Sequence, residues 1–444
     1  MVLWEVLPAL AVLFVGFIAY ARICFRYPPA LVLAVVAYSM ITKSASVAYL
    51  ERVDVYLIEV GIFSYYLGAT PRQIFYNLFI FVIALTIIHQ VIAWQKPAIT
   101  MHLDCFGNSE CNRELRLALA VSAVLLGAQI LNAILSPPYA LPGVGVGRIQ
   151  FWSDIKFPEL ADLFGVLVIF VPAIVGVSLA YGKITNQSYF RRFGLMLMLA
   201  YAGYFTLTGA SFNGWLMASL FCLGPYWIVL WAFGRRLHVK RMGLLAILAV
   251  SIFLVVGYSD IADRGIATRE GSTWNALLYR AFALQGNVYF AADVQASGGD
   301  RHSPTLLLES MASTVQAYMP LGMSEAYIDR KVNLAGSLPG NSIFVYGYWI
   351  GLAPMTIYAI LLGLIGSFFV YIIVTGRFLS IMPGAYLSLW ANNSYAQGSF
   401  GPLLDVKFFL FLGLVILWLL FERSLKQNRR THVQRRVTHS TMLT

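Results

Sequence analysis

The stretch LPALAVLFVGFIAYA, Leu7–Ala21, contains no charged side chain. Apolar runs of about twenty residues, each long enough to cross a bilayer core as a helix, recur along the chain. A backbone in lipid must satisfy its own hydrogen bonds, so such runs are expected to be helical. The 444 residues are 59% hydrophobic and 11% charged, with a mean hydropathy of +0.73. The sequence therefore predicts an all-α polytopic membrane protein whose first apolar run, lacking a preceding basic segment, is a retained span.

We expect about eleven transmembrane helices in a single membrane domain, residues 1–444, with a large loop subdomain at 260–340 and a basic tail at 422–444. The ninth predicted span is too long for one straight helix, and a re-entrant segment before Pro354 would account for its length. The predicted spans are 3–21, 29–49, 73–94, 115–135, 159–181, 193–209, 212–233, 242–259, 341–374, 378–391 and 403–421.

Lysine and arginine concentrate in one set of connections and in the tail RSLKQNRRTHVQRR, residues 423–436. A basic excess marks the cytoplasmic face of a membrane protein. The amino terminus and the 260–340 loop are therefore predicted to lie outside, and the carboxyl terminus inside. The net charge of +11 is then a topology signal and a contact with anionic lipid, so no nucleic-acid partner is expected.

The sequence lacks the residue patterns that several kinds of catalytic site require. Of the 6 histidines, only His302 is predicted to face outward, which disfavours a multi-histidine metal centre. The sequence contains no Asp-x-Asp pair for a metal–nucleotide donor and no G-x-x-x-x-G-K-[ST] loop. We therefore expect neither a metal nor a cofactor. The main charge inside a predicted span is Lys43, which could snorkel to the outer surface.

The outward segments are rich in arginine, whose planar fork of donors suits phosphate oxygens. Arg280 interrupts the apolar run ALLYRAFAL and is the principal candidate, because a charge on an apolar face is costly without a role. Arg264 and Arg269 are either an anion clamp or snorkelling anchors, whereas Arg301 in SGGDR is expected to be solvated. The other candidate anion-binding residues are Arg72 and Arg148, the latter after the irregular segment PPYALPGVGVG.

Three outward side chains are candidate proton acceptors: Asp293, His302 and Glu325. Histidine titrates nearest neutral pH and suits a general base, although His302 also fits a solvated loop residue. Aromatic residues crowd the same segments, Tyr279 beside Arg280 among them. Such rings suit both an interfacial belt and stacking on sugars.

The chain resembles the Wzy-type O-antigen repeat-unit polymerases of the bacterial inner membrane. The resemblance rests on two large outward loops, the second ahead of the last three spans. Its residue-level marks are Arg280 within LLYRAFALQG, Asn341 opening NSIFVYGYWIGLAP, and Arg148 in the earlier loop. It implies a GT-C-like membrane glycosyltransferase whose long loop is periplasmic.

What the resemblance implies is transfer of a growing glycan from undecaprenyl diphosphate onto the next lipid-linked repeat unit. The partners would be these donor and acceptor lipids and the surrounding membrane, with a Wzz-type chain-length regulator as a candidate protein partner. Arg280 would stabilise the leaving diphosphate, and Asn341 and Tyr279 would contact substrate. Two alternatives stay open: an O-antigen ligase, which differs in its acceptor, and a lipid-linked oligosaccharide flippase or other transporter.

Overall fold

The computed structural model describes residues 3–53, 56–57, 60–64, 67–103, 109–140, 148–165, 167–209, 212–235, 285–308, 316–319, 324–325, 336–413 and 416–417. The regular secondary structure of these residues is helical apart from one antiparallel pair of two-residue strands, β1 (Tyr56–Leu57) and β2 (Ile62–Phe63). The expected helical class is therefore confirmed.

The helices fall into three parts of the chain. The first part holds α1 (Leu3–Arg26), η1 (Pro28–Leu33), α2 (Ala34–Leu50), α3 (Ala69–Leu103) and α4 (Ser109–Ile134). The second holds α5 (Arg148–Ser153), α6 (Pro158–Gly165), η2 (Leu167–Phe170), α7 (Val171–Ile184), α8 (Ser188–Leu207) and α9 (Phe212–Ala232). The third holds α13 (Asn287–Ser297), η3 (Pro304–Leu307), α16 (Leu338–Ile350), α17 (Leu352–Val374), η4 (Phe378–Ser380), α18 (Ile381–Gln397) and α19 (Gly401–Leu404).

Six helices in the described ranges are long and apolar enough to cross a membrane: Trp4–Arg26, Pro28–Leu50, Ala69–Lys96, Ser109–Ile134, Gly214–Ala232 and Leu352–Val374. Large apolar side chains on the outer faces of these and neighbouring helices are exposed, such as Phe14 on α1, Leu199 on α8 and Ile357 on α17. Apolar surface on this scale needs lipid rather than water. The chain thus has the features of a multi-pass membrane protein.

Two predicted spans are divided. The region predicted as one helix at 159–181 contains α6, then η2 and α7. The region predicted as one span at 341–374 is divided at Gly351 into α16 and α17, so it is not one straight helix. The re-entrant course proposed for the segment before Pro354 stays a prediction. Within α16, Gly347 has φ 79 and ψ −179, which breaks the helical hydrogen-bond pattern. The predicted span 242–259 lies outside the described residues.

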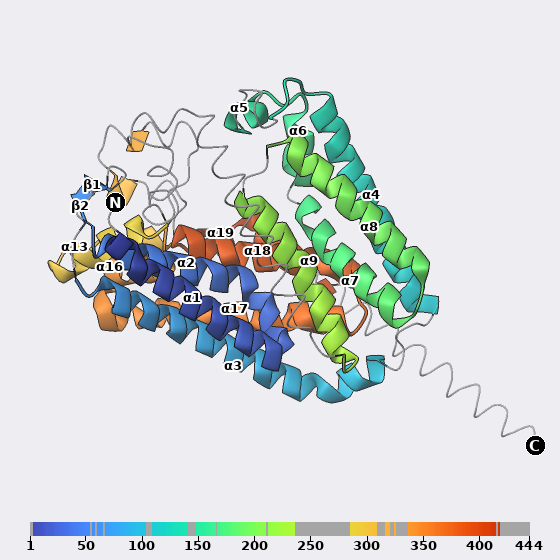
Figure 1. Ribbon diagram of the computed structural model, residues 1–444, viewed down its shortest axis with the longest axis horizontal. Helices are drawn as coiled ribbons and strands as arrows, with labels where there is room; N and C mark the ends of the chain where they lie inside the picture. Colours follow the sequence, from blue (N-terminus) through green and yellow to red (C-terminus); the bar gives the residue numbers. More distant parts are fainter. Residues whose placement is uncertain are drawn as a thin grey trace, which may run out of the picture.

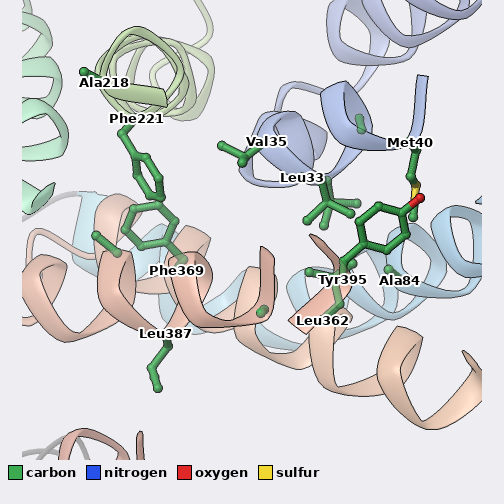
Figure 2. Close-up of a cluster of buried hydrophobic side chains, with 14 of the residues drawn as sticks. Leu33, Val35, Met40, Ala84, Ala218, Phe221, Leu362, Phe369, Leu387 and Tyr395 are labelled. Carbon is green, nitrogen blue, oxygen red and sulfur yellow. The ribbon is translucent and has the colours of Figure 1, made fainter. Parts of the chain in front are cut away.

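The helices form two connected groups (Figure 1). In one, α2 packs between α1 and α3, and α17 lies along α3. In the other, α7 packs against α8 and α9, and α4 packs against α8. Figure 2 shows the apolar core between them, where Phe221 of α9 faces Phe369 of α17 with ring centroids 6.3 Å apart. Burial of these faces packs the two groups against each other.

Helices α13 and α16 lie at one end of the first group, beside β1 and β2 (Figure 1). Helix α13 packs against α16 and also contacts α2 and α3. This end of the bundle includes the last turn of α2 and the first turn of α3, where the apolar spans begin to give way to polar connections. It is here that residues far apart in the sequence form a polar cluster.

Candidate functional site

The centre of the cluster is an ion pair between Arg72 and Asp293. Nε of Arg72 donates to Oδ1 of Asp293 at 2.9 Å, and Nη2 donates to Oδ2 at 2.5 Å. The Asp293 side chain is fully buried, whereas 33% of the Arg72 side chain remains exposed. A bidentate pair of this kind fixes the plane of the guanidinium as well as its position.

The first turn of α3 positions Arg72. Glu51, just after α2, accepts hydrogen bonds from the backbone N–H of Thr70 at 3.0 Å and from the Thr70 hydroxyl at 2.6 Å. A carboxylate at a helix amino terminus satisfies otherwise unpaired N–H groups and the positive end of the helix dipole. Glu51 therefore anchors the helix start that carries Arg72.

Aromatic residues complete the surroundings of the pair. The Arg72 guanidinium carbon lies 5.3 Å from the ring centroid of Tyr348, a cation–π contact. The Tyr348 hydroxyl donates to the backbone carbonyl of Asp293 at 3.2 Å, and the Tyr76 hydroxyl donates to the backbone carbonyl of Tyr348 at 3.1 Å. Helices α3, α13 and α16 are thereby joined around one guanidinium.

The electrostatics of the pair follow from its burial. Burial raises the pKa of the Asp293 carboxyl above its ordinary value, and the hydrogen bonds from Arg72 oppose that rise. Burial also raises the pKa of Tyr289, one turn earlier on α13, well above its ordinary value. The Tyr289 hydroxyl is buried and has no hydrogen-bond partner among the residues that the structure describes. The partly exposed Arg72 is thus held in place by a carboxylate that solvent does not reach.

Two of the predicted site residues, Arg72 and Asp293, are brought together. Asp293 was expected to face solvent as a proton acceptor; instead its carboxylate is directed at Arg72, and its contacts are those of a residue that positions the guanidinium. Asn341 was expected to contact substrate. It is fully buried, donates to the Gly398 carbonyl at 2.9 Å and accepts from the Tyr318 hydroxyl at 2.9 Å, so both ends of its amide contact the protein.

The other predicted residues lie around or beyond this cluster. His302 is half-buried; its backbone N–H donates to the Phe344 carbonyl at 3.2 Å, and its ring centroid lies 5.5 Å from that of Phe344. Glu325 is exposed. The backbone of Arg148 begins α5, which Figure 1 shows well apart from α13 and α16. Four further predicted residues lie outside the described residues: Arg264, Arg269, Tyr279 and Arg280.

The predicted solvation of Arg301 is confirmed, because the residue is exposed; its Nη1 donates to the backbone carbonyls of Ala296 and Asp300, both within five residues of it. Sequence reasoning missed Tyr348 and Tyr76 as members of the cluster. The aromatic segment FVYGYWIG that contains Tyr348 stood out, but nothing in it distinguishes a ring that contacts arginine from one that faces the interface.

Within the described ranges, no group of three or more His, Cys, Asp and Glu side chains is placed to hold a metal ion. Independence from metal remains a prediction. The described cluster supplies a fixed positive charge. It is a partly exposed guanidinium that lies next to aromatic rings at one end of the helix bundle.

Residues 308–412 match the model of a family of unknown function, DUF6418. No curated protein and no solved structure matches the chain. The matched region spans α16, α17, α18 and α19, and so it includes Asn341 and Tyr348 but neither Arg72 nor Asp293.

Proposed function

We propose that this chain is a membrane glycosyltransferase that polymerises lipid-diphosphate-linked oligosaccharide repeat units into a surface polysaccharide of the O-antigen type. The growing glycan would be transferred from undecaprenyl diphosphate to the next lipid-linked repeat at the periplasmic face of a bacterial inner membrane. The proposed topology has about eleven spans, an outward 260–340 loop and an inward carboxyl terminus.

The observation that carries the proposal is the Arg72–Asp293 pair. Two hydrogen bonds hold the guanidinium in one orientation while 33% of the Arg72 side chain stays exposed. A cation that is already oriented needs no reorganisation when negative charge develops beside it. Its place at the end of apolar spans suits an anion attached to a lipid, because a lipid diphosphate lies at the membrane surface.

In the proposed reaction a hydroxyl oxygen of the acceptor sugar attacks the anomeric carbon of the donor glycan. The bond between that carbon and the diphosphate oxygen breaks, and its electron pair leaves with the lipid diphosphate. Arg72 would stabilise the charge that develops on the leaving diphosphate. The acceptor proton passes to a base, for which His302 and Glu325 are better placed than Asp293, because neither is fully buried.

Arg280 remains the principal arginine proposed from sequence, supported by Arg264, Arg269 and Arg148. The first three of these arginines lie outside the described residues, and only the backbone of Arg148 is described. A Wzz-type chain-length regulator is the proposed protein partner. An O-antigen ligase would use the same donor with a different acceptor, the core of the outer-membrane lipid.

A lipid-linked oligosaccharide transporter is the second candidate, and two features favour it. Lys43 is buried within the span Pro28–Leu50, and the helix of α16 is interrupted at Gly347 immediately before the span Leu352–Val374. Transporters place charges and broken helices within the membrane. The partly exposed Arg72 at the bundle end favours the polymerase, because a transporter has no developing diphosphate charge to stabilise.

Deletion of the gene, followed by gel analysis of lipopolysaccharide, tests the three candidates together. Loss of a polymerase leaves the lipid core carrying one repeat and no ladder. Loss of a ligase leaves no repeat on the core while polymer accumulates on the carrier lipid. Loss of a transporter leaves lipid-linked repeats on the cytoplasmic side. Only the first pattern, restored by the wild-type gene, agrees with the proposed function.

A further inference from the structure

Lys43 of α2 lies inside a membrane-spanning helix yet is only 3% exposed. The expectation that it could snorkel to the surface is wrong, because its Nζ is directed into the protein. It donates to the backbone carbonyl of Gly336 and, at 3.2 Å, to that of Ala396. It also lies 5.2 Å from the ring centroid of Tyr395. A buried ammonium in this environment is costly unless these contacts compensate it.

The acceptors explain how the charge is tolerated. Ala396 lies in the last turn of α18, where carbonyl groups lack helical partners and carry the negative end of the helix dipole. Gly336 lies just before α16. In the described part of the chain no carboxylate pairs with Lys43, so carbonyl groups and a tyrosine ring supply its stabilisation.

Lys43 thus joins two chain segments that already lie in close contact, the entry to α16 and the end of α18. Any Cβ at position 336 would overlap the carbonyl oxygen of Gln397, so the two backbones touch there. One turn into α16, Asn341 donates to the Gly398 carbonyl at 2.9 Å. We call these contacts, made by Lys43, Gly336, Asn341 and residues 396–398, the α16–α18 junction.

The junction is connected to α16, whose Tyr348 contacts the Arg72 guanidinium, and to α3, which carries Arg72. Helix α16 runs from the junction to Tyr348, whose ring contacts Arg72. On the other side, the Tyr395 hydroxyl donates to Asn77 of α3 at 2.7 Å, and Asn77 donates to Ser44, the neighbour of Lys43, at 3.0 Å. Asn77 lies little more than one turn from Arg72 on the same helix.

We propose that Lys43 is a positioning residue: by holding the α16–α18 junction against α2, it keeps Tyr348 of α16 in contact with Arg72 of α3. The role in positioning follows from the contacts alone, and its consequence for glycan transfer rests on the proposed function. Lys43 does not touch the Arg72 site itself, so it acts only through the placement of α16.

The first test is hydrogen–deuterium exchange of the purified full-length protein, comparing wild type with Lys43→Met, Lys43→Arg and Lys183→Met. Methionine keeps an unbranched chain but cannot donate to the two carbonyls. Lys183 is the matched control, because its Nζ also lies near a tyrosine, 5.9 Å from the Tyr226 ring centroid, but on α7. In Lys43→Met, the amide exchange rates in residues 336–341 and 394–398 should rise by roughly ten- to a hundredfold. A rise of this size is expected when hydrogen bonds from a charged group are lost.

Lys43→Arg should recover part of the protection against amide exchange, because it retains the charge. Lys183→Met should leave the amide exchange rates at the junction equal to those of wild type. Unchanged exchange at the junction in Lys43→Met would overturn the proposal. This readout does not depend on the reaction, so it stands even where the wild-type protein elongates no glycan.

The second test is a double-mutant cycle on the rate of repeat elongation, using Lys43→Met, Tyr348→Leu and the double variant. If Lys43 acts through Tyr348, the double variant should be no slower than the slower single variant. Independent effects would multiply, as they do for sites without shared partners. If the two single-variant reductions in rate multiply in the double variant, and all the proteins keep wild-type thermal stability, the link to Tyr348 is overturned. A wild-type protein that elongates no glycan would contradict the proposed function only.

Discussion

Arg72 donates two hydrogen bonds to the carboxylate of Asp293, a residue 221 positions later in the chain, and the aspartate is buried while the arginine is partly exposed. This asymmetry separates two roles. Asp293 fixes the orientation, and Arg72 presents the charge at the end of the membrane bundle. The relationship joins α3 to α13, and Tyr348 adds α16 to the same contact.

Arg72→Ala should lower the free energy of unfolding by about 3 kcal/mol, because it leaves a buried carboxylate without its partner. The low end of the usual range applies, since 33% of the Arg72 side chain is exposed. The double variant Arg72→Met with Asp293→Leu should recover most of this loss, because an apolar pair leaves no buried charge. Thermal unfolding in one detergent compares the three proteins. Equal stability of Arg72→Ala and wild type would mean that the pair is not a structural tie.

Gly347→Ala should destabilise the protein by about 1–3 kcal/mol, because φ 79 is a strained conformation for alanine. The added methyl carbon would also lie 3.0 Å from Nη2 of Arg301. Gly127→Ala is the control: an added Cβ at this position inside α4 would meet no neighbouring group of the described residues within 4 Å, so alanine should stabilise that helix by about 0.5–1 kcal/mol. A change of the same sign in the free energy of unfolding of both variants would contradict the strain assigned to Gly347.

The proposed orientation predicts opposite labelling of two introduced cysteines. Ser297→Cys, at the exposed end of α13, should react with a membrane-impermeant maleimide added to the periplasm. Ser440→Cys, in the basic tail, should react only after the inner membrane is permeabilised, because the tail is predicted to be cytoplasmic. Each variant is measured in a background without the protein's own reactive thiols. Labelling of Ser440→Cys from outside would reverse the topology.

Much of the fold could be predicted because lipid imposes a simple rule on the sequence. A long apolar run must be a helix, and the described helices from Trp4–Arg26 to Leu352–Val374 follow runs of that kind. The division between α6 and α7 was not predictable in the same way, since hydropathy measures apolar content and is insensitive to a local break in backbone hydrogen bonds. The length of 341–374 did indicate a break, which Gly347 and Gly351 supply.

The candidate site was only partly predictable for a different reason. Arg72 and Asp293 each suggested a role by residue type and outward position, but their pairing depends on how α13 packs against α3. A single sequence carries no local signal for a contact over that separation. Asn341 shows the converse: its polar amide suggested substrate contact, whereas the fold uses both amide ends to join α16 to Gly398 and Tyr318.

Elongation should need neither a metal ion nor a nucleotide, because the donor is already activated as a diphosphate and the sequence has no Asp-x-Asp pair. Purified protein supplied with lipid-linked repeats should form longer products in the presence of EDTA at the rate seen without it. Heat-treated protein is the control for spontaneous chemistry. Loss of elongation in EDTA, with recovery on addition of magnesium or manganese, would place a metal in the reaction.

The most direct measurement of the central claim is the elongation rate of lipid-linked repeats by the double variant Arg72→Met with Asp293→Leu. This protein should retain most of the wild-type stability yet elongate about a hundredfold more slowly, the loss of roughly 3 kcal/mol expected when one charged donor to a developing anion is removed. Arg72→Lys should retain an intermediate rate, since it keeps the charge without the planar fork. Arg192→Ala, an exposed arginine on α8, should match wild type. A wild-type rate in the stable double variant would contradict the role proposed for Arg72.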